Sequence, residues 1–183
     1  MNALELSLLH LFNPDVEGGL GKIKGDPGGL TNLGVSTPAW KAWLRKKGRP
    51  SVPVSQATRE DVVQLYEEEY WLPEHAHKLP AWAAMLVFDV GVHSGPPSGT
   101  RQLQKILGVS ADGIIGPATQ KALARVKPTD VIRDFTDARA LSLDSIDRRK
   151  YGGRLSRGFN KRVRRLLEHS LLTYLEVSPW QVS

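Results

Sequence analysis

The chain of 183 residues contains no cysteine. A chain without cysteine forms no disulfide bond and no thiolate metal site, so we expect its fold to depend on packing alone, as in a protein made in the cytoplasm. No run approaches the ~20 apolar residues that a membrane-spanning helix needs. The first residues have no basic segment before their apolar stretch, and Glu5 interrupts that stretch. We therefore expect no signal peptide.

The remaining composition is that of a globular protein with a basic surface. Hydrophobic residues make up 40% of the chain, which is enough for the core of one domain or two small ones. The formal net charge is +6 at pH 7. A basic protein favours anionic partners such as nucleic acid, anionic lipid or an anionic cell-wall polymer.

The spacing of apolar residues predicts a mainly α chain with one small β-hairpin. Ser36 or Thr37, Thr58 (with Asp61) and Thr129 are the expected helix caps. Apolar residues cover most faces of the segment that follows Pro80, so we expect a central, buried helix there. The helices are expected at 3–12, from 37 to 48, from 58 to 73, from 80 to a break at 95–99, through 103–107, from 117, from 129 to 146, and at 157–176.

The stretch 17–37 stands apart because it is rich in glycine and still contains spaced polar groups. Glycine costs about 1 kcal/mol per helical position and proline about 3, so this stretch does not form a helix. We expect a short irregular hairpin over 20–35. Glu17 precedes Asp26 by nine residues, and Thr31 follows five residues later. Loops that hold spaced acids on a rigid scaffold are frequent sites of chemistry.

Two carboxylates that flank one bond are the arrangement that glycoside hydrolysis needs. Glu17 at a helix end could be kept protonated by desolvation and donate its proton to a leaving oxygen. Asp26 could stay ionised and orient a water molecule, with the Thr31 hydroxyl as a second partner. The alternative is that Glu17 is an exposed surface residue and that Asp26 serves only its Asp-Pro-Gly-Gly turn.

These residues form a motif that resembles a known family. Glu17-Gly18-Gly19, followed by Asp26-Pro27-Gly28-Gly29-Leu30-Thr31-Asn32-Leu33-Gly34-Val35, is similar to the opening motif of the glycoside hydrolase family 108 muramidases, which are endolysin-type lysozymes of bacteriophages and prophages. The residues of 88–96, 103–109 and 112–119, including Asp-Gly-Ile-Ile-Gly-Pro-Ala-Thr, resemble the predicted peptidoglycan-binding region that follows. Residues 158–163 resemble its closing segment.

The resemblance implies a lysozyme-like α+β fold with a small N-terminal β-hairpin lobe, a long central helix and a helical C-terminal lobe. We expect the lobes at 1–78 and 79–183, in one compact unit. The implied reaction is hydrolysis of the β-1,4 bond between N-acetylmuramic acid and N-acetylglucosamine, with inversion. By position, Glu17 matches the general acid, and Asp26 and Thr31 match the acid and hydroxyl that position water. No cofactor or metal is implied.

Some positions depart from the family pattern or have two interpretations. Leu20, His93 and Phe159 stand where the family has an aromatic residue, asparagine and tryptophan, which affects substrate contacts rather than the reaction. We expect substrate contacts at Gly19, Asn32, Asp89 and His93. For Asp89, inside an apolar helix, the alternative is a buried ion pair, which we favour. For His93 the alternative is a core histidine. The helices after residue 80 could bind peptidoglycan or could simply complete the lysozyme fold.

Histidine and tryptophan residues offer further candidates. His75 and His77, next to Glu74, could ligate zinc as in amidase-type wall hydrolases, but no third ligand at helical spacing accompanies them. We expect no metal. Trp40, Trp43, Trp71 and Trp82 have helical spacing on apolar faces and are expected in the core, although one of them could line a sugar cleft.

Nine lysine and arginine residues and no acid lie between Arg148 and Arg165. This segment could engage anionic outer-membrane lipid, or it could be a solvated basic face that favours the wall in general. We expect peptidoglycan as the partner, no nucleic acid, and a monomer. We expect a protein made in the host cytoplasm that acts on the wall in the periplasm after release.

Two other functions remain open. A lytic transglycosylase needs the acid but not Asp26 and Thr31. A non-catalytic binding protein for anionic wall or nucleic acid would use the +6 charge and would need none of these three residues.

Overall fold

The computed structural model describes residues 1–13, 16, 20–22, 30–153 and 155–177. In chain order its elements are α1 (Ala3–Leu11), β1 (Leu20–Lys22), β2 (Leu30–Asn32), β3 (Val35–Ser36), α2 (Thr37–Lys46), η1 (Val54–Gln56), α3 (Arg59–Tyr66), η2 (Glu67–Trp71), η3 (Ala76–Lys78), α4 (Ala81–Ser94), α5 (Ser98–Ile106), α6 (Pro117–Leu123), α7 (Pro128–Ile146), η4 (Asp147–Tyr151) and α8 (Ser156–Val177).

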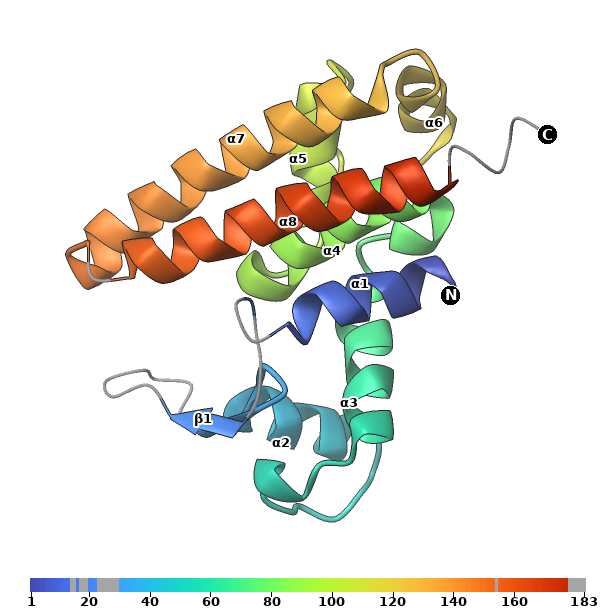
Figure 1. Cartoon of the computed structure of the whole chain (residues 1–183). Coiled ribbons are helices and arrows are strands. Elements are labelled where there is room, and N and C mark those ends of the chain that lie inside the picture. Colours follow the sequence, from blue (N-terminus) through green and yellow to red (C-terminus); the bar gives the residue numbers. More distant parts are fainter. Residues whose placement is uncertain (14–15, 17–19, 23–29, 154, 178–183) are drawn as a thin grey trace.

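The elements form two lobes (Figure 1). The smaller lobe holds the sheet with α2 and α3, and the larger lobe holds α4 to α8. Helix α1 belongs to the N-terminal part of the chain but packs on α4 and α8 of the larger lobe. The predicted mainly α, lysozyme-like architecture is confirmed. The boundary between residues 78 and 79 stays a prediction. No helix within the described ranges combines the length and the apolar character that crossing a bilayer requires.

Helix α4 is the centre of the larger lobe, as its apolar sequence predicts. All residues from Trp82 to Gly91 are buried, and α1, α5, α7 and α8 pack around them. Burial of apolar surface at about 25 cal/mol per Å² is the main force that holds these helices together. Two glycines allow neighbouring segments to pack closely against α4. A Cβ on Gly99 of α5 would overlap the Val87 carbonyl, and a Cβ on Gly91 would overlap the Glu74 side chain.

The sheet has the order β1-β2-β3 and is antiparallel throughout. Strands β2 and β3 are joined by Leu33 and Gly34, with φ values of 49° and 80°. Two successive positive φ angles are typical of a tight hairpin turn. The region predicted as a hairpin over 20–35 is a three-stranded sheet, because a third short strand, β3, follows this turn and pairs with β2.

Side-chain caps define the N-terminal ends of α1, α2 and α3. Ser36 accepts the Ala39 N–H at 3.4 Å and caps α2, and Thr58 and Asp61 form the predicted capping box of α3. The prediction of Thr129 as a cap is wrong. Helix α7 begins at Pro128 after Lys127, because proline, which has no N–H to satisfy, suits the first helical position.

One helix start differs from the predictions because a contact between distant segments determines it, and one predicted helix changes its hydrogen-bond pattern. Helix α5 begins at Ser98, inside the predicted break at 95–99, since the Glu74 carboxylate accepts the N–H groups of Gly99 (3.0 Å) and Thr100 (2.8 Å). Burial raises the pKa of Glu74 even though these hydrogen bonds oppose the shift. The helix predicted from 58 to 73 changes to π-helical hydrogen bonding at η2.

Candidate active site

Thr31 occupies the middle of the central strand β2. It is paired with Gly21 of β1 and with Ser36 of β3. Gly21 has no side chain and Ser36 has a small one, so both residues paired with Thr31 are small. Thr31 is partly exposed.

Asn32, a predicted substrate contact, points its amide at η1. Its Nδ2 donates to the carbonyls of Val54 (3.1 Å) and Ala57 (3.2 Å). Since successive side chains of a strand point to opposite faces, Thr31 lies on the face away from η1. Both Asn32 donors are thus occupied within the protein, which gives the residue a structural role. Its contact with substrate stays a prediction.

The sheet is also fixed on the side of α3. The Tyr66 hydroxyl donates to the Leu33 carbonyl at 3.1 Å, in the turn directly after β2. Tyr66 is 1% exposed and packs against Phe12 and Tyr70, with ring centroids 6.0 Å and 5.7 Å away. The strand that bears Thr31 is therefore held by one hydrogen-bonded anchor on each side. Such anchors keep the side chains of a strand in position.

Glu17, Gly19 and Asp26 lie outside the described residues. The described residues that flank this segment show which elements it connects. Helix α1 ends at Leu11, and the N–H of Val16 donates to the Asn13 carbonyl at 2.8 Å. The segment with Glu17 thus connects the end of α1 to β1. The catalytic roles predicted for Glu17, Asp26 and Thr31 stay predictions.

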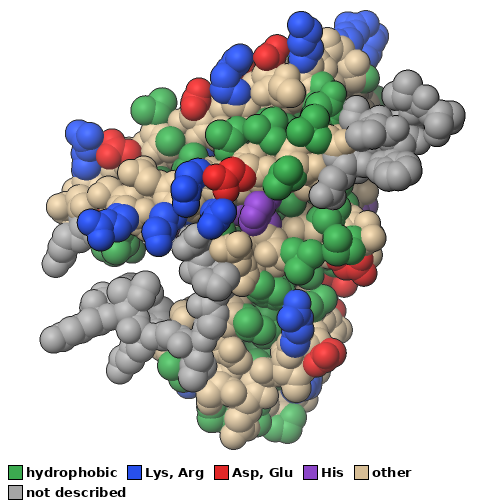
Figure 2. Space-filling model, viewed as in Figure 1, with side chains coloured by type: hydrophobic (Ala, Val, Ile, Leu, Met, Phe, Trp, Pro, Cys, Tyr) green, Lys and Arg blue, Asp and Glu red, His purple; other side chains and the backbone are tan. Residues whose placement is uncertain are grey.

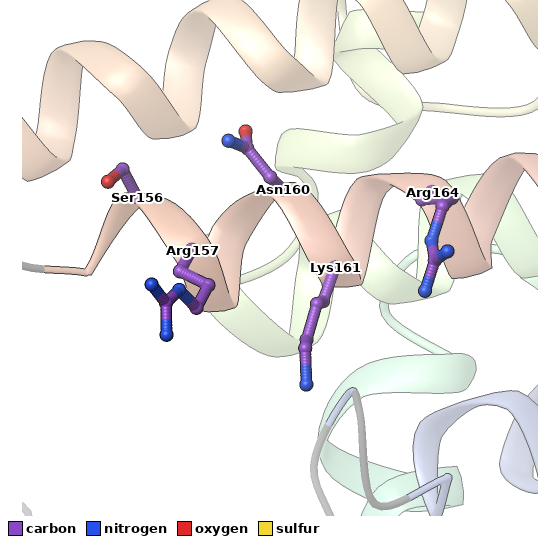
Figure 3. A pocket seen from close by; sticks show the side chains of 5 residues that line it. All are labelled: Ser156, Arg157, Asn160, Lys161 and Arg164. Atoms are coloured by element: carbon purple, nitrogen blue, oxygen red, sulfur yellow. The ribbon is translucent and has the colours of Figure 1, made fainter.

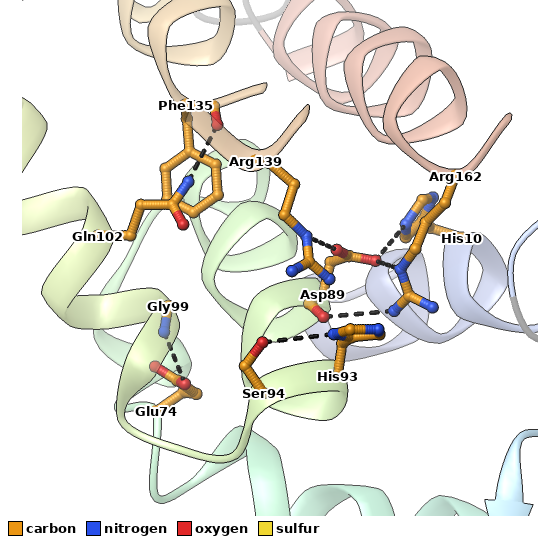
Figure 4. A network of polar contacts seen from close by, with 10 residues as sticks. All are labelled: His10, Glu74, Asp89, His93, Ser94, Gly99, Gln102, Phe135, Arg139 and Arg162. Carbon is orange, nitrogen blue, oxygen red and sulfur yellow. Dashed lines mark hydrogen bonds and ion pairs between the residues drawn. The ribbon is translucent and has the colours of Figure 1, made fainter. Parts of the chain in front are cut away.

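Asp89, on α4, is the centre of a buried ionic network (Figure 4). Its Oδ1 lies 2.7 Å from Arg162 Nε and 3.4 Å from His10 Nε2, and its Oδ2 lies 3.2 Å from Arg139 Nε. Burial alone would raise the pKa of Asp89, but the charges of Arg162 and Arg139 outweigh it and hold this pKa well below its usual range. The geometry agrees with the interpretation of Asp89 as a buried ion pair, and substrate contact at Asp89 stays a prediction.

His93 lies one turn further along α4, near its C-terminal end. Its ring packs edge-on against Phe159 of α8, with centroids 5.7 Å apart, and its Nδ1 lies 3.4 Å from the Ser94 hydroxyl. Burial, and then the charges of Arg139 and Arg162, lower the pKa of His93 to about 4. His93 is therefore neutral at pH 7. It is partly exposed, so substrate contact at His93 stays a prediction.

A pair of histidines lies between α1 and α8. The Nδ1 atoms of His10 and His169 lie 3.0 Å apart. Two protonated rings would repel at this distance, so one nitrogen donates and the other accepts. Burial, and then the electrostatic interaction with His10, lower the pKa of His169.

The candidate zinc ligands are not brought together. Glu74 is fully buried against α5, and the ring centroids of His75 and His77 are 6.3 Å apart. Within the described ranges no group of three His, Cys, Asp or Glu side chains could hold a metal ion.

The four tryptophans are in the core, as predicted. Trp40 and Trp43 are 1% exposed, Trp71 is 4% exposed and Trp82 is 7% exposed. Trp40 Nε1 donates to the Val52 carbonyl at 2.9 Å, and Trp43 Nε1 donates to Glu68 at 3.0 Å.

The Asp112–Thr119 motif has a structural explanation within the larger lobe. Gln104 of α5 is 1% exposed. Its Nε2 donates to Asp112 (2.7 Å), the Ile114 carbonyl (3.0 Å) and Thr119 (3.2 Å), and its Oε1 accepts the Gly113 N–H (2.8 Å). The motif therefore fixes the turn before α6 onto α5.

The basic run 148–165 is not one helix. Its first residues belong to η4, whose C-cap is Gly152, a glycine with a left-handed backbone conformation. Helix α8 begins at Ser156. Arg162 points inward to Asp89. The inward contacts of Arg139 and Arg162 could not be identified from the sequence, although the isolated Asp89 in an apolar helix indicated that a cation must lie nearby.

A small antiparallel sheet beside a helical lobe built around a buried central helix is a lysozyme-like architecture. Residues 14–95 match the family model described as Glycosyl hydrolase 108. The chain is also similar to the solved structure of Brucella abortus SagA, with 30% sequence identity and a TM-score of 0.78 over 93% of this chain and 94% of that one. No curated protein matches the chain.

The protein belongs to the glycosyl hydrolase 108 family. This membership gives it a peptidoglycan-hydrolysing, lysozyme-like function, and the recognition made from the motifs is confirmed.

Proposed function

We propose that the protein is a muramidase that hydrolyses the β-1,4 bond between N-acetylmuramic acid and N-acetylglucosamine. The observation that carries this proposal is the family match over residues 14–95, which spans Glu17, Asp26 and Thr31. The central position of Thr31 in the sheet, between Gly21 and Ser36, supports a role in positioning a small molecule such as water.

In the proposed mechanism Glu17 is the general acid and protonates the glycosidic oxygen as the C–O bond breaks. Asp26 is ionised and accepts a proton from a water molecule, whose oxygen bonds to the anomeric carbon. The Thr31 hydroxyl holds this water in line for attack. Water attacks from the face opposite the leaving oxygen, so the configuration inverts, as expected when the second carboxylate acts through water.

The proposed biological role is that of a phage or prophage endolysin. The protein would be made in the host cytoplasm and would reach the wall from the periplasmic side after release through a separate pore-former. The support is the resemblance of the Glu17–Val35 motif to endolysin-type enzymes, together with a charge of +6 that favours an anionic wall.

The test is mass spectrometry of purified Gram-negative peptidoglycan after digestion by the wild type, by Glu17→Gln and by Glu60→Gln. Glu60 is an exposed acid in the first turn of α3 and serves as the matched control. We expect muropeptides that end in reducing N-acetylmuramic acid from the wild type and the control. Glu17→Gln should yield none.

Other products would contradict the proposal in distinct ways. Anhydro-muramic ends would identify a lytic transglycosylase. Free peptides with intact glycan would identify an amidase, and His75 and His77 would then have to be tested as zinc ligands. Undigested wall with retained binding would identify a non-catalytic binding protein.

A further inference from the structure

A groove lies in the smaller lobe, between α2 and the segment that follows it. Two hollows of ≈ 520 Å³ and ≈ 310 Å³ share Lys41 and Ser51 in their walls, so they join into one groove. Leu44 of α2 lines the larger hollow, and Leu30 of β2 and Val54 of η1 line the smaller one. The groove therefore combines apolar walls with a basic edge.

Hydrogen bonds hold the two walls of the groove together. The Trp40 indole of α2 donates to the carbonyl of Val52 at 2.9 Å, and Val52 lines the smaller hollow. At the other end the N–H of Arg49 donates to the carbonyl of Leu44 at 2.9 Å. The groove is thus formed before any ligand arrives, so binding there does not have to order the chain first.

The charge of α2 is concentrated at this groove. Residues 37–49 contain five lysines and arginines and no acid. Three of the cations are paired with acids of α3 and η2: Lys46 with Glu69 (2.6 Å), Lys47 with Glu68 (2.5 Å) and Arg49 with Asp61 (2.6 Å). The other two are Lys41 and Arg45, which are exposed and line the groove. Among the described residues no acid pairs with either of them.

The groove is separate from the candidate catalytic group. Asn32 donates its amide to the carbonyl of Val54, which lines the groove. Successive side chains of a strand point to opposite faces, so the groove lies on the face of β2 opposite Thr31. A ligand in the groove would therefore hold the smaller lobe without occupying the face on which Thr31 lies.

We propose that this groove binds a stem peptide of peptidoglycan, the short acidic peptide attached to muramic acid, with Lys41 and Arg45 contacting two of its carboxylates. This inference rests on the proposed function for the identity of the polymer. Residues at i and i+4 are about 6 Å apart along a helix. Carboxylates on alternate residues of an extended peptide are about 7 Å apart, which is a similar spacing.

The two kinds of wall fit the two kinds of group on such a peptide. The guanidinium of Arg45 can bind a carboxylate through two parallel hydrogen bonds, and the ammonium of Lys41 adds a point charge. The apolar side chains of Leu44 and Val54 would receive the methyl groups of the alanines. Burial of these methyl groups contributes affinity that a purely ionic contact in water does not give.

A glycan or a nucleic acid fits the groove less well. Bases stack on aromatic side chains, and sugar rings also pack on aromatic faces. Among the described residues that line the groove none is aromatic. The peptide is therefore the part of the wall polymer that suits these walls.

A second hollow, on α8, provides a contrast. Figure 3 shows the polar and charged side chains that line this hollow of ≈ 440 Å³, which offers no apolar side chain to an alanine methyl group. Figure 2 shows that Lys and Arg side chains also gather over the larger lobe. These cations attract an anionic wall in general, so a test of the groove needs a control that removes the same charge elsewhere.

The test measures binding separately from cleavage. Variants are made in a Glu17→Gln background so that the glycan stays intact, and co-sedimentation with sacculi gives the affinity. The groove variant combines Lys41→Gln with Arg45→Gln. The control combines Lys121→Gln with Arg125→Gln, which are also an exposed lysine and arginine at i and i+4, in and just after α6.

We expect the groove variant to bind intact sacculi about fivefold more weakly, as for the loss of two exposed charge pairs, and the control to change by less than about twofold. On sacculi whose carboxylates have been converted to neutral methylamides, both variants and their parent should bind equally. Equal weakening by both variants, or a defect that persists on neutralised sacculi, would overturn the proposal. So would a defect seen only with vesicles containing phosphatidylglycerol, which would assign the groove to lipid.

Two further measurements separate a binding role from a structural or catalytic one. Lys41→Arg combined with Arg45→Lys keeps both charges and should bind within about twofold of the parent, and weak binding by this variant would contradict a role based on charge. In the enzyme that retains Glu17, the groove variant should raise the KM for sacculi and keep kcat within about twofold. A loss confined to kcat would place the two cations in the catalytic machinery instead.

The two proposals fail independently. The expected binding pattern without muramic-acid ends in the wild-type digest would retain the groove and refute the muramidase. Muramic-acid ends with no binding defect in the groove variant would do the reverse. Thermal unfolding of the groove variant and the control should match the parent, because all four side chains are exposed.

Discussion

The guanidinium of Arg162 lies 2.7 Å from the carboxylate of Asp89, and the two side chains are 5% and 0% exposed. Arg139 approaches the same carboxylate from α7 at 3.2 Å. One acid of α4 thus joins two helices that follow it by 50 and 73 residues. The larger lobe depends on this network for the relative placement of α4, α7 and α8.

Removing the acid should strongly destabilise the protein. Asp89→Asn removes the carboxylate charge that two buried guanidinium groups contact, and breaking such a buried pair costs about 3–5 kcal/mol. Urea unfolding should show a lower midpoint with an unchanged slope. Arg148→Gln, which removes an exposed pair at 3.0 Å, is the control and should cost less than about 0.5 kcal/mol. Equal losses in both variants would contradict the assignment.

The same network predicts a dependence of stability on pH. The pKa of Asp89 is lowered in the folded state, so the stability it contributes is fully present above the unfolded value of about 3.9 and is lost as the pH falls below it. The free energy of unfolding of the wild type should therefore decrease below about pH 4. Asp89→Asn should show a smaller decrease over that range, and an identical slope would refute the prediction.

Gly99 should be intolerant of alanine. A Cβ at this position would overlap the Val87 carbonyl, a backbone atom that no rotamer change can move. Overpacking of this kind costs typically about 1–3 kcal/mol, and contact with the backbone places Gly99→Ala at the upper end. Gly158→Ala, with nothing within 4 Å, should instead stabilise α8 by up to about 1 kcal/mol. Thermal unfolding of the two variants distinguishes them.

Asn32 should matter for stability. Asn32→Ala leaves the carbonyls of Val54 and Ala57 without their side-chain donor, and loss of such hydrogen bonds costs about 1–3 kcal/mol. The unfolding midpoint should fall, and the KM for peptidoglycan should stay within about twofold, because both amide donors of Asn32 are already used within the protein. A large rise in KM at unchanged stability would instead establish the substrate contact.

Thr31 should affect catalysis with little effect on folding. Thr31→Ala removes the hydroxyl proposed to hold the attacking water and should lower kcat by about 10²-fold. Thr31→Ser keeps the hydroxyl and should retain most of the activity. Thermal unfolding should change little in either variant, because Thr31 is partly exposed. Full activity of Thr31→Ala would show that the Thr31 hydroxyl has no role in the mechanism.

The parts of the fold that local chemistry determines could be predicted from the sequence. The capping box of Thr58 and Asp61 needs only residues three apart. The apolar spacing placed the tryptophans and α4 in the core. Gly91 and Gly99 were not distinguished from other glycines, because the atoms that approach them come from distant segments.

The same limit applies to charged residues. The sequence shows that Asp89 needs a cation, but it does not say which of the 25 lysines and arginines supplies it. Arg162 was grouped with a solvated basic run, and only the packing of α8 on α4 separates it from Arg157 and Lys161. Likewise the start of α5 depends on Glu74, which lies 25 residues before Gly99. Pairings at such separations are properties of the tertiary structure.

The shared carboxylate of Asp89 also constrains how the family can diverge. A relative that replaces this acid with an apolar residue would lose the carboxylate that both buried guanidinium groups contact, so the replacements at positions 89, 139 and 162 should be inherited together. Single exchanges at these positions would be removed by selection. Substitution patterns within α8 should thus separate Arg162, which holds the fold, from the exposed cations of the same helix.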